Sequence, residues 1–187
     1  PASFKLGKIP TASKINAVVE KIKSQPKSLR KIIFCHYRGE IDELSQRLTK
    51  EGYTVALMDG RSKKRDRLAA CQTTVSEEFL KFSGLSNVRH KIDSFLAPDC
   101  LIAQINSASE GLNLQHFSQV YFTSPHWNPA VEDQAIARAH RIGQKLAVQV
   151  FRFQMAPFKP NTFTLDNYCM FVQETKRDLM KIIEPEN

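Results

Sequence analysis

Apolar and polar residues follow one another in blocks along the chain, and most blocks have the length of a strand or a helix. Short apolar runs rich in β-branched and aromatic residues predict buried strands, at residues 31–37, 53–60, 99–105, 118–125 and 147–153. Apolar residues at three- and four-residue spacing predict helices, at residues 13–25, 38–53, 90–98, 128–142 and 164–183. The segment 68–88 shows only patchy helical periodicity.

Strands that alternate with helices predict an α/β fold, with a parallel sheet covered by helices on both faces. In such folds the functional loops follow the carboxyl ends of the strands. We therefore expect one edge of the molecule to carry four loops, namely HYRGE (36–40), DGRSKKR (59–65), NSASEGLNL (106–114) and SPHWNPA (124–130).

Length and composition fit this picture of one folded domain. The chain has 187 residues, of which 42% are hydrophobic and 25% charged. This composition is enough for a hydrophobic core and argues against a disordered chain. No apolar run approaches the roughly 20 residues that span a bilayer, so we expect no membrane partner. The first residues, PASFKLGKIP, lack both an initiator Met and the apolar region of a signal peptide. We expect the chain to be part of a longer protein.

The chain is basic, with a formal net charge of +8 and a pI near 9.4. This charge indicates either a polyanionic partner, nucleic acid first, or simply a soluble surface. Five of the seven residues from Arg61 to Arg67 are basic, Lys63 and Lys64 among them. This run predicts either a track for a phosphate backbone or a solvated loop.

Cysteine and histidine spacing argues against a metal site. None of the four cysteines forms a CxxC pair, and the five histidines show no paired ligand spacing. Cys35 and Cys100 fall inside apolar runs, where free buried cysteine is ordinary. We therefore expect a reducing compartment, the nucleus or the cytoplasm. The serines of NSAS lack a GxSxG elbow, and no GxGxxG follows a strand, which argues against a hydrolase nucleophile and a dinucleotide site.

The helix predicted at 128–142 carries the most distinctive chemistry. Gln134, Arg138 and Arg141 are spaced by four and three residues, so one helical stripe would hold all three. The alanines between them allow another surface to approach closely. Guanidinium groups stay charged and present a planar fork to phosphate oxygens. The stripe is either a phosphate clamp or an ordinary solvated helix face.

The sequence around this helix resembles a known family. SPHWNPAVEDQAIARAHRIGQ (124–144) resembles motif VI, and the strand and turn before it, of Swi/Snf-type ATPases among the RecA-like helicases and DNA translocases. SASEGLNL (107–114) is similar to motif V and KIIFCHY (31–37) to motif IV. MDGRS (58–62) is similar to the loop after the next strand, and YCMFVQETKRDLM (168–180) to the trailing helix. The resemblance covers about residues 10–184, with a gap at 66–88.

The resemblance implies the C-terminal, second RecA-like lobe of such an ATPase. Residues 1–155 would form the lobe, with an insertion near 66–88, and residues 156–187 a linker and a C-terminal bracing helix. The apolar side of that helix would pack on the lobe or contact a missing domain; it holds Leu165, Tyr168, Cys169, Val172, Leu179 and Ile183.

The resemblance also implies roles for individual residues. Arg138 and Arg141 would approach the γ-phosphate of ATP as catalytic arginines, with Gln134 supporting them and Gly111 and Asn113 shaping the edge of the cleft. A DNA-backbone track would include Asn106, Ser107, Ser109, His36, Arg61, Lys63 and Lys64. Trp127, the one tryptophan, would be largely architectural, although it could instead stack on a base. Motif V here lacks the doubled glycine of many relatives, which leaves its DNA contacts less defined.

Two motifs of a complete ATPase are missing. The chain has no GxxxxGK[ST] phosphate loop and no DExH-like strand. ATP with Mg would therefore be bound mainly by an N-terminal RecA-like lobe of the same polypeptide, and the isolated chain should be inactive. The resemblance implies a double-stranded-DNA translocase rather than a strand-separating helicase.

Two other functions remain open from the sequence. The chain could be a catalytically inactive nucleic-acid-binding or scaffolding module of the same fold, or the lobe of an RNA helicase. Remodelling, repair, transcription and viral genome handling all fit the resemblance, so a viral source also stays open.

Overall fold

A computed structural model describes residues 12–60, 98–106, 114, 116–142, 144, 146–157 and 162–183. The strands are β1 (Lys31–Cys35), β2 (Val55–Met58), β3 (Cys100–Gln104), β4 (Gln119–Phe122) and β5 (Gln149–Arg152). The helices are α1 (Ala12–Lys23), α2 (Arg38–Lys50), α6 (Pro129–Ala139) and α7 (Leu165–Ile183). The predicted strands are present, each shorter than predicted. The helix predicted at 90–98 falls almost wholly outside the described residues, as does the segment 66–88.

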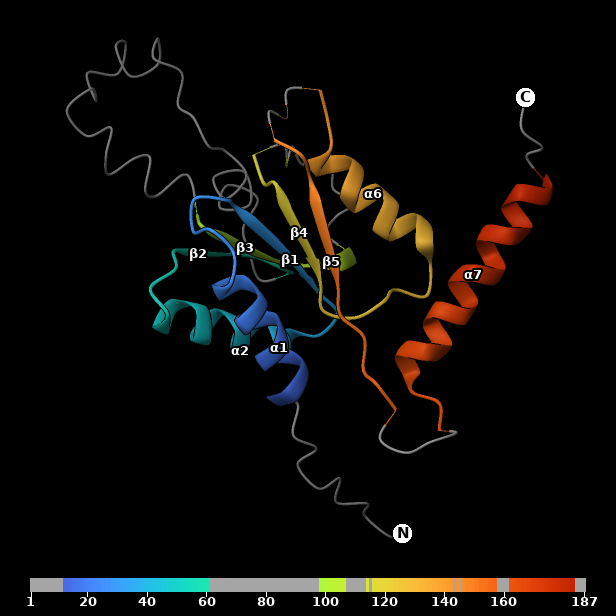
Figure 1. Cartoon of the computed structure of the whole chain (residues 1–187), viewed down its shortest axis with the longest axis horizontal. Coiled ribbons are helices and arrows are strands. Elements are labelled where there is room, and N and C mark those ends of the chain that lie inside the picture. The colour runs from blue at the N-terminus through green and yellow to red at the C-terminus, as the bar shows by residue number, and fades with distance from the viewer. Residues whose placement is uncertain are drawn as a thin grey trace, which may run out of the picture.

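The five strands form one parallel sheet in the order β2-β3-β1-β4-β5 (Figure 1). In the register of the central strand, Ile32 lies between Leu101 of β3 and Val120 of β4. The predicted parallel sheet is therefore confirmed. β1 is buried at every position, which agrees with its continuous apolar sequence and its central place.

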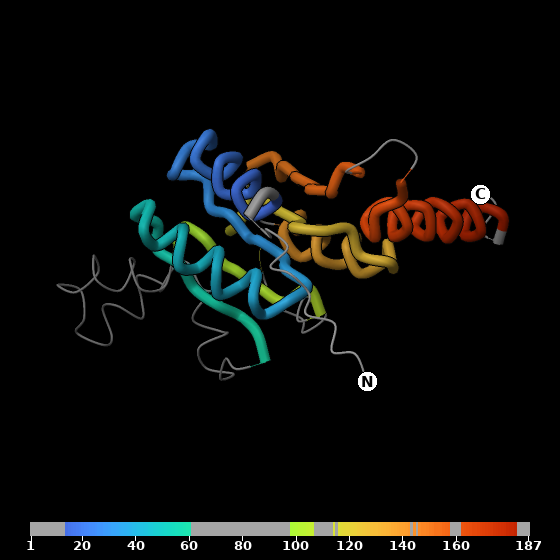
Figure 2. The backbone as a smooth tube through the Cα atoms, turned by 90° about the horizontal axis from the view of Figure 1, so that it is seen from below, coloured from blue at the N-terminus to red at the C-terminus, as the bar shows by residue number. Residues whose placement is uncertain are grey.

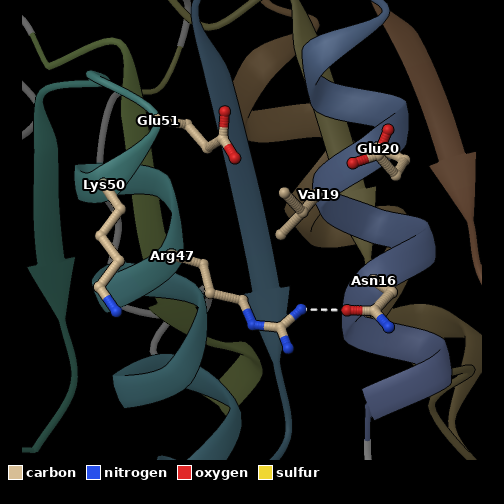
Figure 3. Close-up of a pocket in the computed structure, with 6 residues that line it drawn as sticks. All are labelled: Asn16, Val19, Glu20, Arg47, Lys50 and Glu51. Carbon is tan, nitrogen blue, oxygen red and sulfur yellow. Dashed lines mark hydrogen bonds between the residues drawn. The ribbon is translucent and has the colours of Figure 1, made fainter.

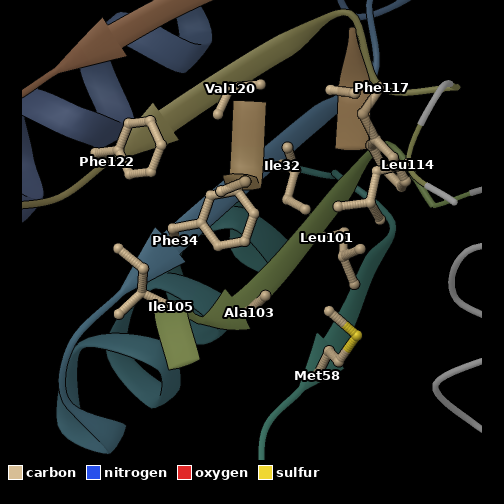
Figure 4. Packing of buried hydrophobic residues seen from close by; sticks show 12 residues of the cluster. Ile32, Phe34, Met58, Leu101, Ala103, Ile105, Leu114, Phe117, Val120 and Phe122 are labelled. Atoms are coloured by element: carbon tan, nitrogen blue, oxygen red, sulfur yellow. The ribbon is translucent and has the colours of Figure 1, made fainter. Parts of the chain in front are cut away.

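Alternate residues of each strand serve two separate cores, one on each face of the sheet. One face packs against α6 through Ala135 and Ala139, and its largest members come from the strands and the segments beside them (Figure 4). They include Ile32, Phe34, Met58, Leu101, Val120 and Phe122. The other face packs against α1 and α2 and includes Ile33, Cys35, Ile102 and Tyr121. Helices therefore cover both faces, as predicted.

α7 lies apart from the sheet. In two perpendicular views it runs beside α6 rather than over a strand (Figures 1 and 2). Its first turn is fixed by the Asp166 carboxylate, which pairs with Lys14 of α1 at 2.5 Å and accepts the Met155 N–H at 2.7 Å. The Lys14 ammonium also donates to the Ser124 hydroxyl after β4 at 2.6 Å. The helix is thereby attached at its start to two elements of the domain.

Leu101 on β3 provides a test of the α6-side core, because its side chain is fully buried. Leu101→Ala should lower the free energy of unfolding by about 2–5 kcal/mol, since it removes apolar contact and leaves a cavity. Urea unfolding followed by circular dichroism measures the change. Leu146→Ala is the matched control, because Leu146 is 53% exposed and its loss should cost under about 0.5 kcal/mol. Equal costs at the two positions would contradict the core described here.

Candidate functional site

The carboxyl edge of the sheet gathers the turns that follow β1, β3 and β4. Because all strand pairs are parallel, His36, Asn106 and Ser124 each leave the sheet at this edge. His36 and Ser124 are in direct contact, with the His36 Nε2 atom 3.1 Å from the Ser124 carbonyl oxygen. The structure thus brings two of the predicted loops together through a hydrogen bond between a side chain and the main chain.

A glutamate from the following helix anchors the turn after β1. The Glu40 carboxylate of α2 accepts the main-chain N–H groups of His36 at 3.1 Å and Tyr37 at 3.2 Å. These donors precede the first turn of α2, where they have no partner within the helix. Glu40 therefore fixes the path of the chain from strand to helix and, with it, the position of His36.

The turn after β4 is anchored in the same way by Glu132 of α6, a fully buried residue. Its carboxylate accepts the His126 N–H at 2.8 Å, the Arg152 Nε–H at 2.9 Å and the Gln173 amide at 2.8 Å. A buried carboxylate is costly unless charge and hydrogen bonds compensate it, and here both do. Glu132 consequently joins α6 to the β4 turn, to β5 and to α7.

Trp127 lies beside this anchor and is 56% exposed. Its ring stacks on that of His126 with 5.6 Å between centroids, and the Lys176 ammonium of α7 lies 4.1 Å from its centroid. The largely architectural role inferred from the resemblance accounts for these two contacts. It does not account for the exposed half of the indole.

The start of α6 follows its sequence signals. Asn128 is the N-cap residue, with its side-chain oxygen accepting the Ala130 N–H at 3.2 Å, and Pro129 occupies the first turn. Such caps typically stabilise a helix by about 1 kcal/mol.

The end of α6 differs from the prediction. The helix was predicted to run to 142, but it ends at Ala139, so Arg141 does not continue the helical stripe of Gln134 and Arg138. His140 leaves the helical conformation, with φ −86° and ψ 79°, and the Gln144 amide donates to the carbonyls of Ala139 at 3.3 Å and Phe117 at 3.2 Å. This amide supplies a partner for a terminal carbonyl of α6 and turns the chain toward the start of β4.

Arg138 occupies the last turn of α6 and is half-buried, whereas Gln134 and Arg141 are exposed. The Arg138 carbonyl accepts the Leu114 N–H at 3.2 Å, so the motif V-like segment ends against the motif VI-like helix. Within the described residues, no carboxylate forms an ion pair with Arg138 or Arg141. Arg138 can therefore offer its guanidinium to an anionic ligand without first losing a carboxylate partner of the described domain.

The two groups of predicted residues lie toward different edges of the sheet. α6 begins after the carboxyl end of β4, and the segment at its far end bonds to Phe117, just before the start of β4. Arg138 and Arg141 are therefore near the amino edge, while His36 and Asn106 are at the carboxyl edge. Other candidates lie outside the described residues, namely Ser107, Ser109, Gly111, Asn113, Arg61, Lys63 and Lys64.

A surface hollow lies between α1 and α2, away from these residues (Figure 3). It is lined by Asn16, Val19, Glu20, Arg47, Lys50 and Glu51, and Arg47 donates to the Asn16 side chain across it. Its acidic and basic groups balance, so it selects no charged ligand. In the described parts of the chain, no cluster of three His, Cys, Asp or Glu could hold a metal, and no helix is long and apolar enough to cross a membrane.

The apolar side of α7, predicted either to pack on the lobe or to contact a missing domain, is only partly covered in this structure. Leu165, Tyr168 and Leu179 are each more than half exposed. The helix instead contacts α6 through polar groups: Gln173 binds Glu132, and Arg177 pairs with Asp133 at 3.0 Å. The helical pattern predicted an apolar side but not which surface covers it.

Two buried cysteines are inert. Cys35 and Cys100 are free and fully buried, and burial raises the pKa of the Cys100 thiol to about 12 and that of Cys35 further. Both thiols stay protonated at neutral pH, which excludes them as nucleophiles.

Sequence reasoning missed Glu132, His126, Arg152 and Gln173 as site residues. The partners of Glu132 lie 20 and 41 residues further along the chain, so no local spacing marks them. The one available signal was the position of His126, two residues before the helix cap.

The chain is similar in sequence to one protein family and to several known proteins. A family model described as "Helicase conserved C-terminal domain" matches residues 85–143. The DNA repair protein RAD5 of Candida albicans is 30% identical over 181 residues, covering 94% of this chain and 15% of that protein. The DNA repair protein rad5 of Aspergillus fumigatus is 29% identical over 181 residues, covering 90% and 14%.

A solved structure supports the fold. The crystal structure of the C-terminal part of the Fun30 ATPase domain aligns with a TM-score of 0.58 at 20% identity, covering 90% of this chain and 54% of that one. The five-stranded parallel sheet is thus RecA-like. The chain spans about one seventh of the length of the two RAD5 proteins.

Glu132→Ala should lower the free energy of unfolding by about 3–5 kcal/mol, because it leaves three donors and the Arg152 charge without their buried acceptor. Chemical denaturation measures this loss. Asp133→Ala removes the neighbouring carboxylate, whose ion pair with Arg177 is exposed, and should cost less than about 1 kcal/mol. A small loss at Glu132, similar to that at Asp133, would show that the buried anchor contributes little.

Proposed function

Because the chain belongs to the Swi/Snf-type helicases as their C-terminal RecA-like lobe, we propose that it is the second lobe of an ATP-dependent double-stranded-DNA translocase. The observation that carries the proposal is the placement of α6. This motif VI-like helix starts among the turns of the carboxyl edge and ends, with Arg138, against the motif V-like segment. One rigid element thus connects the candidate DNA track with the candidate phosphate-binding arginines.

The arginines supply the catalytic contribution of this lobe. Arg138 and Arg141 would contact the γ-phosphate of ATP, which is held with Mg mainly by the N-terminal RecA-like lobe. Fixed positive charge at the transferring phosphoryl group stabilises its transition state. One observation supports this role for Arg138: it forms no ion pair with a carboxylate of the described residues. Gln134, one turn before Arg138, would support the pair, and Gly111 and Asn113 would shape the cleft edge.

The carboxyl edge would carry the DNA backbone. His36 and Asn106 lie there after adjacent strands, and Ser107 and Ser109 follow Asn106 directly in the sequence. Arg61, Lys63 and Lys64 follow β2, the next strand of the sheet, and would add the positive charge that a phosphate track requires.

ATP binding and hydrolysis would drive the movement along DNA. Closure of the two lobes brings Arg138 and Arg141 to the γ-phosphate, and hydrolysis removes the bridging charge and lets the lobes separate. For the two ligands to be coupled, both must favour the same closed state. α6 provides that connection in this lobe, because a shift at its arginine end is transmitted to the turn at its start.

The relatives bear on the cellular setting. The two RAD5 proteins are fungal DNA repair proteins by name. We therefore place the chain's work on DNA in the nucleus, and a viral source has no support from them.

Arg138→Ala and Arg141→Ala are the direct tests of the arginine assignment, made in a protein that also carries the N-terminal lobe. Each should lower duplex-DNA-stimulated ATP hydrolysis by about 10³-fold, because a transition-state charge is lost. Arg47→Ala, which removes an arginine of α2 on the opposite face of the sheet, should leave the rate unchanged. A near wild-type rate for Arg138→Ala and Arg141→Ala would overturn the assignment, as would robust ATP turnover by the isolated chain.

RNA serves as the comparison stimulant of ATP hydrolysis, and stronger stimulation by RNA than by duplex DNA would favour an RNA helicase.

Replacing Arg61, Lys63 and Lys64 with Ala tests the DNA track. Each lost phosphate contact should reduce the slope of log K against log salt by about 0.9, because fewer counterions are released on binding. Fluorescence anisotropy with a labelled duplex between about 50 and 200 mM salt measures the slope. A triple replacement of Lys21, Lys23 and Lys50 removes the same charge from α1 and α2, away from the proposed track, and should change the slope less. Equal changes would indicate non-specific attraction only.

A further inference from the structure

His126 is a buried titratable residue that the proposed function does not use. It is 6% exposed, and its ring neighbours those of His36 and Trp127, with 5.6 Å between centroids in each pair. Its main chain is fixed on both sides, because its N–H donates to Glu132 and its carbonyl accepts the Gln173 amide. The imidazole therefore connects the exposed indole to the turn that follows β1.

The Nδ1 atom of His126 lies within hydrogen-bonding distance of two main-chain groups of Asn128. It is 3.0 Å from the Asn128 nitrogen and 3.1 Å from the Asn128 oxygen. An unprotonated Nδ1 accepts the N–H, whereas a protonated Nδ1 must donate to the carbonyl instead. The carbonyl already accepts the Val131 N–H at 3.2 Å, but the Asn128 N–H would lose its acceptor. The protonation state of one atom thus decides whether this N–H is bonded.

The neutral state also completes a local chain of caps. The His126 side chain accepts the N–H two residues ahead, and the Asn128 side chain accepts the N–H of Ala130, two residues further. Together these bonds define the path of Trp127 and the first turn of α6. Side-chain acceptors at such i, i+2 positions hold a turn without any contribution from the sheet.

Charged groups face His126 from several elements. Those nearest to it are His36 after β1, Glu132 of α6 and Lys176 of α7, while Glu40 of α2 binds the main chain of His36 and Arg152 of β5 binds Glu132. Burial lowers the pKa of His126, and His36 and Lys176 lower it further. Donation from Nδ1 to the Asn128 carbonyl raises the pKa, as does the Glu132 carboxylate, but the pKa is lowered overall. The imidazole is therefore neutral at neutral pH, and in the tautomer that carries its proton on Nε2 the Nδ1 atom accepts the Asn128 N–H.

We infer that His126 is a positioning residue, whose neutral Nδ1 holds Trp127 and the start of α6 in place by accepting the Asn128 N–H. The inference concerns the geometry of the turn, and its consequence for ATP hydrolysis rests on the proposed function. Protonation would release the N–H and place positive charge against His36 and Lys176. Both effects loosen the same turn, so Trp127 should leave its stacked position in acid.

The lowered pKa of His126 makes the stability of the fold decrease toward acid pH. An unfolded histidine binds its proton with a pKa of about 6.5, and the folded chain binds it less readily. The neutral imidazole thus contributes stability that is complete above that value and declines as the pH falls through the lowered pKa.

Intrinsic fluorescence tests the inference, because Trp127 is the one tryptophan of the chain. If Trp127 leaves the His126 ring in acid, its indole becomes more exposed to water and its emission shifts to the red. A titration from about pH 8 to pH 5 should therefore show a red shift with a midpoint below the ordinary histidine value of about 6.5. Circular dichroism over the same range checks that the fold is retained.

Two variants of His126 distinguish the effect of its hydrogen-bond acceptor from the effect of its ring. His126→Asn places an amide oxygen near the Nδ1 position, so it should keep the spectrum of pH 8 and abolish the acid transition. His126→Ala removes the acceptor and should already show red-shifted emission at pH 8. His36→Asn should raise the midpoint, because it removes the neighbouring histidine that lowers the pKa of His126. His140→Asn, at the far end of α6, is the matched control and should change nothing.

The inference fails if His126→Asn shows the red-shifted spectrum of His126→Ala, since the ring and not the acceptor would then hold the turn. It also fails if the acid transition persists in His126→Asn. Should the alanine variant not fold, the asparagine and His36→Asn titrations still decide the question.

Hydrolysis of ATP by the two-lobe protein adds a separate readout. His126→Asn should retain the duplex-DNA-stimulated rate at pH 8 and flatten its acid limb, and His126→Ala should raise the DNA concentration needed for half-maximal stimulation several-fold. If fluorescence behaves as expected and no DNA-stimulated hydrolysis exists, the positioning role stands and the proposed function fails. If hydrolysis behaves as proposed and the fluorescence transition is absent, the positioning role is overturned.

Discussion

A single buried carboxylate, that of Glu132, holds together the segments that meet beside the carboxyl edge. Taking this charge out of water is costly, and three hydrogen-bond donors from the β4 turn, β5 and α7 offset the cost. α6 is held both by this arrangement and by its core-facing residues, the buried Ala135 and Ala139 and the partly buried Val131 and Ile136. Without this arrangement, a helix with so few large apolar residues would have little to fix its rotation.

α6 connects the two regions of the domain to which we assign a function. Its eleven residues span about 16 Å, from the turn that carries Trp127 to the segment that carries Arg138 and Arg141. Side-chain bonds fix the chain at both ends: Asn128 caps the start, and Gln144 binds the carbonyl of Ala139. A helix fixed in this way moves as a unit, as the proposed link between a DNA track and a phosphate contact requires.

The sequence predicted those parts of the structure that depend on burial of whole elements. β1 and β4 are apolar at most positions because both faces of the sheet are covered, so their runs could be recognised without the fold. The end of α6 could not be predicted from the helical pattern of Ala139 to Ile142. The Gln144 amide binds the Phe117 carbonyl, which lies 27 residues earlier in the chain. Glu132 escaped for the same reason: an acid on a helix looks solvated until its partners are placed around it. α7 shows the converse, since an apolar side was evident but the surface that covers it was not.

The three-donor carboxylate also has a consequence for the way the chain can vary in descent. A substitution of Glu132 alone would leave hydrogen-bond donors from three segments without their acceptor. A substitution of Arg152 alone would leave the Glu132 carboxylate with uncharged partners only. Neither step is neutral, so a lineage that changes one of these positions has to change the others soon afterwards. Glu132, Arg152 and Gln173 should therefore be inherited as a set, although they lie far apart in the sequence.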